Sequence, residues 1–394
     1  MAITIKMAQS AKEIDDIFKL RYQVYVVEDG KFGEEKSKRI FDRYDALQGV
    51  ANIVAYEEGV AVGTIRVVKD TGCGLPTDEV FDFSEYKKSI KTNNALFVCA
   101  GMLAISSRWR NRRDVIAALF KMATGVCKAW GVTHAFANAN HEVTSVYERV
   151  GFEPVAEKIW VEEVKNYVIP MAAPFSRPCD WAFGELVENN LDDFWLEHFT
   201  SKFVRVLLSV GEVLFNQGDE ADAVYIVDNG WVNIVKHDDS GQELNLAALS
   251  KGALFGELAL IDNHDRSASA VAMTNAEIIK LSKDDFLSNL KNSVDGVEKL
   301  LQVFADRLRA TDELALVMAY APQTARVKYA LDKLKSTAKP RTSDENVLIA
   351  KCGPQEIAKV AGVREFEVRR ILEMEKQQKK LDYSEKRIRF FKAV

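Results

Sequence analysis

Short alternations of apolar and polar residues dominate the middle third of the chain. From Val210 the sequence runs VGEVLFNQGDEADAVYIVDNGWVNIVKHDDSGQELNLAALSKGALFGELALIDNHDRSASAVA, and glycines interrupt it at positions 211, 218, 230, 241, 252 and 256. A period of two, with a turn residue about every ten positions, is typical of antiparallel strands that form a barrel or a sandwich. The pattern therefore predicts an all-β domain over residues 201–295.

The residues before this domain mix strand-like and helical periods. Strands are expected at Asn52–Glu57, Ala61–Val68, Ala95–Ala104 and Thr133–Ala139, and helices at Ala11–Glu28, Val115–Trp130 and Glu142–Val150. Alternation of the two kinds of element is typical of a helix-covered sheet. Residues 1–175 are therefore predicted to form an α/β domain with a mixed sheet.

Helical spacing returns after the all-β domain. Apolar residues recur with a helical period through Val297–Ala319, which predicts one long helix. Further on, GPQEIAKVAGVREFEVRRILEMEKQQKKL predicts two short helices joined at Gly362, and β-prone runs flank them at Asn346–Ala350 and Arg387–Phe391. This order predicts a winged helix-turn-helix domain over residues 322–394.

The composition fits a multidomain protein without a membrane span. The 394 residues exceed one ordinary domain of about 100 to 200 residues. No run approaches the roughly 18 unbroken apolar residues of a membrane helix, and the first residues, MAITIKMAQSAKEIDD, lack the apolar core of a secretory signal. The five cysteines are scattered and form no CxxC pair, which indicates isolated thiols, most of them in the core, and neither a disulfide frame nor a zinc site. We therefore expect a cytoplasmic protein.

Charge is distributed unevenly along the chain. Residues 1–175 carry 23 basic and 23 acidic side chains, whereas residues 322–394 carry 18 and 10, and the remainder of the totals of 53 and 58 leaves 12 and 25 for residues 176–321. A terminal domain with a net charge of +8 would attract a polyanion such as double-stranded DNA. A solvated basic face is the alternative interpretation.

Two charged residues stand in the apolar layers of the predicted β-domain. Gly256 lets backbone amides approach an anion, Glu257 can accept a hydrogen bond from a ribose hydroxyl, and Arg266 offers a planar fork of donors for a phosphate. Burying Glu257 and Arg266 without partners would cost several kcal/mol, so a ligand with hydroxyls and a phosphate is expected. The alternative is an internal salt bridge between them in an empty barrel.

The same residues carry a family resemblance. FGELAL followed by RSA resembles the phosphate-binding cassette of cyclic-nucleotide-binding domains, and the resemblance extends from about Val204 to Leu290. It implies that the cyclic phosphate and the ribose are held by Gly256, Glu257, Leu258, Arg266 and Ser267. Many cGMP-selective relatives have Thr where this chain has Ser267 or Ala268, which favours cAMP as the ligand.

The long helix and the tail resemble the Crp/Fnr family of regulators. FADRLRATDELALVMAYAPQTARVKYALDKL resembles that family's dimer helix, which implies a homodimer and places Thr311 against the adenine; Asp312 departs from the family pattern. In the tail, Glu365 and Phe366 replace an Arg-Glu pair that reads base edges. The remaining candidate DNA contacts are Arg364, Glu365, Arg369 and Arg370. A protein-contact or regulatory module is the alternative.

The first domain resembles acyltransferases. Asn140, Tyr147 and Gly151-Phe152 form the pattern N-x6-Y-x3-G-F, which resembles the final helix and strand of GCN5-related N-acyltransferases. There the Tyr lies beside the sulfur of coenzyme A, and a phenol with a pKa near 10 can donate a proton to a departing thiolate. The resemblance implies acyl-coenzyme A as donor, Tyr147 as the catalytic acid and Asn140 in the cofactor site. A half-buried core tyrosine is the alternative for Tyr147.

A second resemblance concerns the acceptor and the pyrophosphate. FKLRYQVYVVEDGKF, FDRYDA and VGTIRV resemble acyl-homoserine-lactone synthases and N-acyl amino acid synthases, which implies an amine acceptor site shaped by Arg21, Asp42, Asp45 and Arg66. The Glu and Arg that lactone synthases carry on the fourth strand are absent from VCAGM at 98–102. The glycines of the family's pyrophosphate loop are also replaced, so the candidate pyrophosphate contacts are the side chains of Arg110, Arg112 and Arg113.

The expected architecture is therefore a multidomain α/β, β-barrel and winged-helix protein. Its parts are an N-acyltransferase-like α/β domain at 1–175, a helical linker at 176–200, a cyclic-nucleotide-binding jelly roll at 201–295, a dimerisation helix at 296–321 and a winged helix-turn-helix domain at 322–394. We predict a cAMP-regulated acyltransferase and transcriptional regulator with allosteric coupling. The alternative is a cAMP-dependent transcription factor whose first domain senses acyl-coenzyme A or another small molecule without catalysis.

Overall fold

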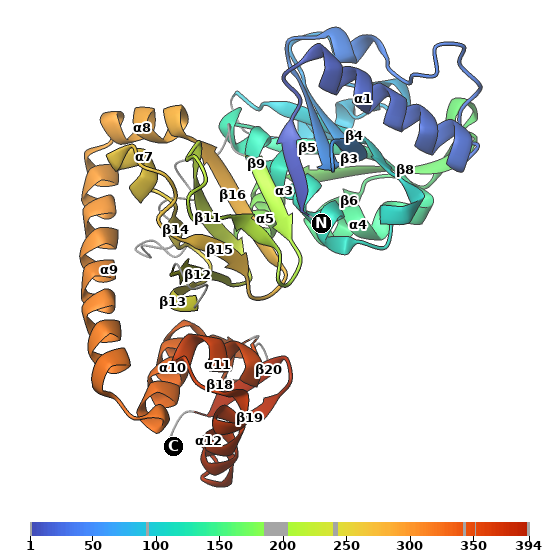
Figure 1. Ribbon diagram of the computed structural model, residues 1–394. Coiled ribbons are helices and arrows are strands. Elements are labelled where there is room, and N and C mark those ends of the chain that lie inside the picture. The colour runs from blue at the N-terminus through green and yellow to red at the C-terminus, as the bar shows by residue number, and fades with distance from the viewer. Residues whose placement is uncertain are drawn as a thin grey trace. The chain divides into compact units, whose positions relative to one another are not determined.

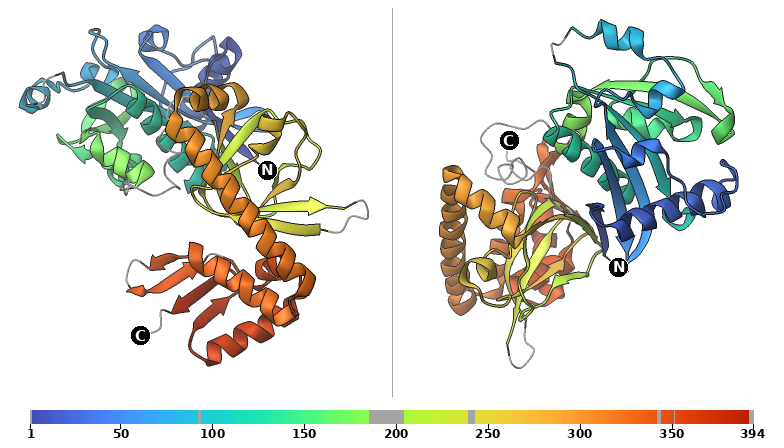
Figure 2. Two further views of the ribbon diagram at one scale, coloured as in Figure 1. Left: turned by 90° about the vertical axis from the view of Figure 1, so that its left-hand side faces the viewer. Right: turned by 90° about the horizontal axis from the view of Figure 1, so that it is seen from above.

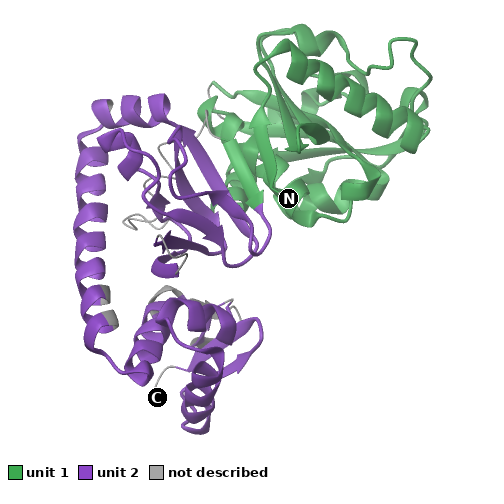
Figure 3. Cartoon of the chain, viewed as in Figure 1, with its two compact units in different colours: residues 1–193, 197–207 green, residues 194–196, 208–394 purple. Residues whose placement is uncertain are grey.

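The computed structural model describes residues 2–91, 94–184, 204–238, 243–341, 344–350 and 352–391. The chain divides into two compact units (Figure 3), a front unit of residues 1–193 and 197–207 and a rear unit of residues 194–196 and 208–394. The predicted linker begins with helix α5, Ser176–Phe183, and its remainder from residue 185 to residue 200 lies outside the described residues.

One mixed sheet forms the centre of the front unit (Figure 1), with neighbouring strands in the order β9-β1-β2-β3-β4-β5-β8-β6, and β7 paired with β8. Its strands are β1 Ile3–Met7, β2 Val50–Glu57, β3 Val60–Lys69, β4 Phe97–Ile105, β5 His134–Asn140, β6 Glu153–Pro154, β7 Ile159–Val161, β8 Asn166–Pro174 and β9 Val204–Leu208. The pair β4–β5 is parallel, and its neighbours in the sheet are antiparallel. The predicted mixed sheet is confirmed.

Helices cover both faces of this sheet. They are α1 Ala11–Tyr22, α2 Ser84–Ser89, α3 Arg113–Ala129, α4 Thr144–Val150 and α5, and short 3-10 turns include η3 Pro76–Glu79, η5 His141–Val143 and η6 Glu162–Val164. Ser10 caps the N-terminus of helix α1. Its hydroxyl accepts from the backbone N–H of Glu13, and the Glu13 carboxylate accepts from the N–H of Ser10. Beyond α1, Gln23–Glu28 continue as the π-helix η1, so the predicted helix to Glu28 changes its winding near its end.

The sheet opens between β4 and β5. These strands pair only from Phe97 to Cys99, opposite His134–Phe136. Just past that point Met102 adopts a left-handed conformation with φ of 52°, and the register of β4 against β3 shifts between Thr64 and Arg66. Irregular backbone of this kind re-aims side chains and ends ladder pairing. The end of the β4–β5 ladder therefore leaves room for a cavity within the sheet.

A β-barrel of two sheets begins the rear unit, with neighbouring strands in the orders β10-β15-β12-β13 and β14-β11-β16. The strands are β10 Val213–Phe215, β11 Ala223–Asn229, β12 Val232–His237, β13 Glu243–Leu249, β14 Leu254–Phe255, β15 Ser269–Ala272 and β16 Ala276–Ser282. The turn at Gly230 requires glycine, because its φ is 84° and an added Cβ would lie 2.4 Å from the Asn275 carbonyl oxygen. The predicted antiparallel barrel is confirmed, and the range 201–295 also contains helices.

Helix α7, Leu258–Asp262, lies between β14 and β15, and helices α8, Lys283–Asn292, and α9, Val294–Tyr320, follow β16. The long α9 (Figure 1) matches the single helix that the spacing predicts. One side of α9 contributes the buried Leu300. Its exposed apolar residues are Val294, Val297, Leu301, Leu308, Leu316 and Tyr320.

The described part of the tail contains three helices and a four-stranded antiparallel sheet in the order β17-β18-β20-β19 (Figure 2). Its elements are α10 Gln323–Thr337, β17 Lys339–Arg341, β18 Asp344–Ala350, α11 Pro354–Ala361, α12 Glu365–Gln377, β19 Leu381–Ser384 and β20 Arg387–Phe391. Gly362, with φ of 60°, ends α11 in the left-handed conformation that a tight turn requires. Core packing joins α10, α11, α12 and the hairpin through Val327, Leu331, Ile357, Val368, Leu372, Ile388 and Phe390.

Cys99, Cys127 and Cys352 are buried, Cys179 is partly buried and Cys73 is exposed. Among the helices of the described ranges, none is both long enough and apolar enough to cross a membrane.

Candidate functional sites

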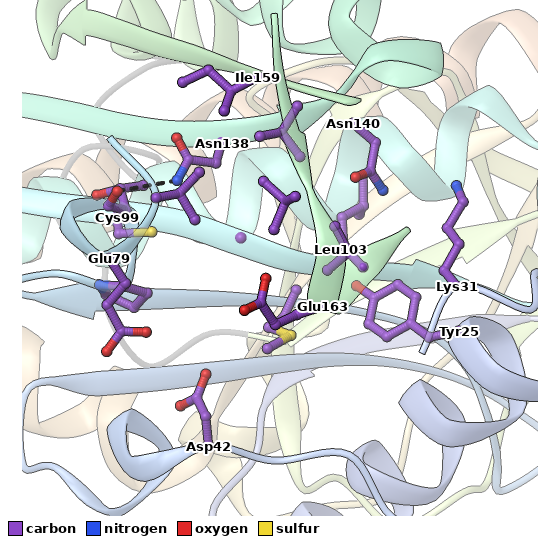
Figure 4. Close-up of a pocket in the computed structure, with 18 of the residues that line it drawn as sticks. Tyr25, Lys31, Asp42, Glu79, Cys99, Leu103, Asn138, Asn140, Ile159 and Glu163 are labelled. Carbon is purple, nitrogen blue, oxygen red and sulfur yellow. Dashed lines mark hydrogen bonds between the residues drawn. The ribbon is translucent and has the colours of Figure 1, made fainter. Parts of the chain in front are cut away.

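A cavity of about 540 Å³ lies where β4 and β5 cease to pair. Its walls come from η1, η3, β4, β5 and the segment from β7 through η6 to the start of β8. Figure 4 shows Tyr25, Cys99, Asn138 and Glu163 around it. Much of the remaining wall is apolar, including Phe32, Val80, Leu103, Val143, Ile159, Val161 and Val168. A pocket of this size with a few polar groups can hold a small organic ligand.

Tyr147 of α4 and Asn140 at the end of β5 both line this cavity, as the acyltransferase resemblance implies. The Tyr147 ring is 3% exposed and makes edge contacts with Phe120 and Phe152, at centroid distances of 5.3 and 5.6 Å. Burial raises the pKa of the Tyr147 phenol well above its usual value. The phenol is therefore protonated at neutral pH and can act as a proton donor.

The four predicted acceptor-site residues form one network, but they do not share one environment. Asp42 and Arg66 line the cavity, whereas Arg21 is fully buried behind them. The Arg66 guanidinium donates to both Asp42 oxygens at 2.7 Å and to Asp45 at 2.8 Å. Arg21 donates to the Asp45 carboxylate at 3.1 and 3.2 Å and also to Asn52. Two guanidiniums and two carboxylates thus neutralise one another.

Asp45 is the centre of this network. Burial alone would raise the pKa of its carboxyl, but the attraction of Arg21 and Arg66 outweighs burial and the net pKa is lowered. Its side chain is 4% exposed. These contacts indicate that Arg21 and Asp45 stabilise the fold. Of the four predicted acceptor-site residues, Asp42 and Arg66 line the cavity and can be reached by a ligand in it.

The predicted pyrophosphate arginines lie outside the cavity lining. Arg110 donates to the Ile105 carbonyl and forms ion pairs of 2.9 and 2.8 Å with Glu28 and Asp29. Arg112 pairs with Asp114 at 2.6 Å. Arg113 is the first residue of α3. Carboxylates thus already engage two of the three guanidiniums.

In the rear unit, the Arg266 guanidinium lies inside the barrel and is 3% exposed. It donates to the carbonyl oxygens of Gly256 and Ala223, both at 2.6 Å, and lies 4.4 Å from the centroid of the Phe215 ring. An added Cβ at Gly256 would come within 2.7 Å of the guanidinium, so glycine permits this approach. Arg266 Nε has no hydrogen-bond partner among the described residues.

Glu257 is fully buried at the start of α7, and its carboxylate accepts a hydrogen bond from Arg307 of α9. Arg307 also donates to the Leu254 carbonyl. Burial raises the pKa of the Glu257 carboxyl, and the nearby charges of Arg307 and Arg266 offset only part of that effect. Its second oxygen, Oε2, lacks a partner within the described part of the chain. A hydroxyl donor for Oε2 and a phosphate acceptor for Arg266 Nε are therefore what the pair requires.

Arg307 was not among the residues expected in this site. It precedes Thr311 by one helical turn, and the Thr311 hydroxyl donates to the Arg307 carbonyl at 2.8 Å. A basic residue four positions before a predicted base contact shares its helix face, and that spacing was the available signal. Of the other predicted contacts, Leu258 is 47% exposed, and Ser267 and Thr311 are exposed.

The predicted DNA-contact residues cluster on and beside α12. Arg369 forms ion pairs of 2.6 Å with Glu365 in its own helix and 2.7 Å with Glu385 in the hairpin turn. Arg370 pairs with Glu367 at 2.9 Å. Arg364, at the N-terminal cap of α12, is exposed. The structure thus brings the four residues together and pairs two of the three arginines with carboxylates.

Comparison with known proteins finds two families along this chain. The profile described as N-acyl amino acid synthase FeeM matches residues 16–174, and the profile of the cyclic nucleotide-binding domain matches residues 205–293. The cyclic AMP receptor protein of Thermus thermophilus is 38% identical over 134 residues, which are 34% of this chain and 62%, less than two thirds, of that protein.

One further relative and one solved structure are similar to parts of this chain. The cAMP-activated global transcriptional regulator CRP of Salmonella typhimurium is 30% identical over 162 residues, which are 41% of this chain and 77% of the relative. The solved structure of FeeM, an N-acyl amino acid synthase from uncultured soil microbes, aligns with 45% of this chain and 92% of its own at 15% identity, with a TM-score of 0.39.

The charge network generates a stability prediction. Asp45→Asn removes one carboxylate between two buried guanidiniums, and we expect the free energy of unfolding of the front unit to fall by about 3 to 5 kcal/mol. Hydrogen exchange of the β2 and β3 amides in the full chain measures this loss. Asp180→Asn, at an exposed position of α5, is the control and should change little.

The same network predicts the direction of a pH effect. The pKa of Asp45 is lower in the folded chain than in the unfolded chain, so its ionised form contributes stability above the unfolded value of about 4. That contribution is lost as the pH falls through the lower folded value. A stability difference between the wild type and Asp45→Asn that did not shrink on acidification would contradict the assignment.

Proposed function

Since the chain belongs to the CRP-type family of cyclic-nucleotide-binding regulators and carries a FeeM-type N-acyl amino acid synthase domain before it, we propose that cAMP binding in the barrel regulates acyl transfer to an amine in the front unit. The regulatory part rests on the buried Glu257 and Arg266, each of which has one side-chain atom without a hydrogen-bond partner among the described residues. A cyclic ribose phosphate offers a hydroxyl donor to the first and anionic oxygens to the second.

Within the rear unit, helix α9 is the element whose position we expect nucleotide binding to change. Arg307 ties α9 to Glu257, and a ribose hydroxyl at Glu257 would share the carboxylate with it. A ligand shifts a conformational equilibrium only through unequal affinity for the two states, and a change from mostly off to mostly on requires about 5.5 kcal/mol. We infer that nucleotide binding changes the position of α9 by altering this contact.

A second copy of the chain is the proposed partner of α9. Its exposed apolar residues Val294, Val297, Leu301 and Leu308 follow the spacing of a coiled-coil seam. Pairing of two such helices would remove these side chains from water and bring two nucleotide sites together. The proposed homodimer would make the response of α9 cooperative.

The acyl-transfer part of the proposal rests on the cavity of the front unit. The acceptor nitrogen attacks the carbonyl carbon of an acyl-coenzyme A thioester, a C–N bond forms and the C–S bond breaks. Tyr147 lines the cavity as a buried, protonated phenol, so it can donate its proton to the departing thiolate. We assign Asn140, which lines the same cavity, to the pantetheine arm of the donor. Arg113, at the start of α3, is the guanidinium we assign to the pyrophosphate.

Nucleotide binding is tested by calorimetric titration of the full chain with cAMP and cGMP. Arg266→Ala is expected to weaken cAMP binding by about 100-fold or more, because hydrogen bonds to charged groups contribute about 1.5 to 3 kcal/mol each. Arg309→Ala, on the exposed side of α9, is the matched control. Arg266→Lys, which keeps the charge but loses the fork, should be intermediate. Tight binding by a folded Arg266→Ala protein would refute the assigned pocket.

Catalysis is tested by replacing one hydroxyl. Tyr147→Phe should reduce acyl transfer by about 100-fold and leave acyl-coenzyme A binding unchanged, since a positioned general acid contributes about 10² to 10⁴ in rate. Tyr167→Phe, at an exposed position of β8, is the control. If the protein binds no acyl-coenzyme A with or without cAMP, the front unit is not a transferase of this donor.

A second candidate function, DNA binding, is favoured by the tail. Its order of helix, glycine turn, helix and hairpin, and its net charge of +8, fit a winged helix-turn-helix domain. In that case cAMP would govern transcription, and the front unit would act as a sensor of acyl-coenzyme A. The ion pairs of Arg369 and Arg370 would have to open or turn toward phosphate during binding.

DNA binding is tested by the dependence of affinity on salt concentration. Affinity of the cAMP-treated protein for random duplex DNA should fall steeply with salt, and Arg370→Ala should reduce the slope of log K against log salt by about 1. Arg39→Ala in the front unit serves as the control. Absence of affinity at low salt in the presence of cAMP would leave the tail with a protein-contact role.

A further inference from the structure

Two basic residues, Arg66 and Lys31, belong to the lining of the front cavity. Arg66 is 3% exposed and donates to Asp42 and Asp45 at distances of 2.7 to 2.8 Å. Together with Arg21, this network holds two positive and two negative charges and is balanced without a ligand. A further carboxylate at Arg66 would be repelled by the two that are already there. An anionic group of a ligand therefore requires another partner in this cavity.

Lys31 has donor capacity for such a group, because its acidic neighbours are bound by other donors. Its Nζ lies 3.5 Å from Glu142 and 3.9 Å from Asp29, beyond the roughly 2.7 to 3.2 Å of an ordinary N–H···O hydrogen bond. Glu142 accepts from the Asn166 side-chain amide at 3.0 and 3.3 Å, and Asp29 pairs with Arg110 at 2.8 Å. An ammonium carries three donors, so Lys31 can bind a ligand without losing a short contact.

The carboxylates in the cavity lining do not cancel this positive charge. Asp42 is paired with Arg66, and the other three acids of the lining, Glu79, Glu162 and Glu163, are exposed. The Lys31 side chain is only 22% exposed. Since water screens exposed charges strongly, these three acids weaken the attraction of an anion to Lys31 only slightly.

The local backbone holds Lys31 next to Tyr25. In the π-helix η1 the N–H of Asp29 donates to the Val24 carbonyl, five residues back, and Gly30 then adopts a left-handed conformation with φ of 61°. This turn returns the chain, and the N–H of Lys31 donates to the Tyr25 carbonyl at 2.8 Å. Both side chains line the cavity, as Figure 4 shows.

Tyr25 supplies a neutral donor at this place. Its side chain is 7% exposed, and its ring lies 5.2 Å from that of Phe32 between centroids. Burial raises the pKa of the Tyr25 phenol to about 12, so the hydroxyl keeps its proton at neutral pH. Within the described ranges, this hydroxyl has no hydrogen-bond partner. It can therefore donate to a ligand beside the Lys31 ammonium.

We propose that Lys31 and Tyr25 form the subsite that binds the α-carboxylate of an amino acid acceptor, with the ammonium on one oxygen and the phenol on the other. This inference rests on the proposed acyl transfer and names the residues that select its acceptor. One ammonium and one neutral phenol balance a single negative charge, whereas a phosphate monoester carries a charge of about −1.5 to −2 at neutral pH. Tyr147 and Asn140 line the same cavity, so an acceptor bound in this way shares it with the thioester.

Matched acceptors test the subsite by calorimetry. The full chain is titrated with each common amino acid in the presence of cAMP and coenzyme A. The amino acid that binds most tightly is then compared with the amine that lacks its α-carboxylate. We expect the amino acid to bind at least about tenfold more tightly, because hydrogen bonds from an ammonium and a phenol hold its carboxylate. Competition of the two compounds for acylation from acyl-coenzyme A should show the same order.

Three variants assign the preference to its residues. Lys31→Met removes the charge and keeps most of the side-chain length, so amino acid binding should weaken by about tenfold or more while amine binding stays nearly unchanged. A merely structural role would weaken both. Tyr25→Phe should weaken amino acid binding by about fivefold, and Lys31→Arg should retain part of the preference. Lys36→Met, at an exposed position outside the cavity lining, is the control and should bind both compounds as the wild type does.

The outcomes separate the subsite from the function on which it rests. Equal or tighter binding of the amine, no binding of any amino acid, or an unchanged preference in Lys31→Met overturns the inference. Acylation of an amine from acyl-coenzyme A would then still leave the proposed function in place. If Lys31→Met weakened acyl-coenzyme A binding and spared the amino acid, Lys31 would contact the donor's phosphates and the inference would fail. Failure of the wild type to bind acyl-coenzyme A refutes the transferase, whereas a carboxylate preference that Lys31→Met removes would still support the subsite.

Discussion

Burial of a charged group costs several kcal/mol unless other groups of the protein replace the hydrogen bonds that water made to it. In the front unit, Asp42, Asp45 and Asn52 provide these hydrogen bonds for Arg21 and Arg66. In the rear unit, two backbone carbonyls provide them for Arg266, and Arg307 provides one for Glu257. Both candidate sites are therefore built around charges whose partners are fixed by the fold.

The carboxylates of the two sites differ in their partners. Both Asp45 oxygens accept hydrogen bonds and the carboxyl pKa is lowered, which favours the ionised state, although Arg21 Nε has no partner among the described residues. In the barrel, Glu257 Oε2 and Arg266 Nε both lack partners in the described part of the chain, and the pKa of the Glu257 carboxyl is raised. A carboxylate whose oxygens are both satisfied helps to hold a fold in place, whereas one with an unsatisfied oxygen gains free energy when a ligand supplies the missing donor. Similar residue types thus serve different tasks.

Much of the fold was accessible from the sequence, because regular periods and turn residues express backbone geometry directly. The strand expected at Arg387–Phe391 has those bounds, and the helix expected at Val297–Ala319 extends by only a few residues. The π-helical end of the first helix was missed, since i+5 winding leaves no distinct apolar period. The short strands β6 and β7 contain too few residues for a period to be read.

The candidate sites were less predictable because they depend on contacts between distant segments. Tyr147 and Asn140 lie on one cavity as expected, since a local motif placed them close together. Arg307 was missed, because it does not belong to the motif that defines its site and only packing brings it there. The pairing of Arg110 with Glu28 and Asp29 could not be foreseen from a basic run alone.

Strand β9 has a consequence for how this polypeptide can be divided. Its residues 205–207 pair with Ile3, Thr4 and Ile5 of β1, so a segment near residue 205 covers one flank of β1. A front fragment that stopped at residue 200 would expose that flank of β1 to other chains, and unpaired flanks of this kind promote aggregation. An excised front fragment should therefore run through Leu208, which keeps the strand that pairs with β1.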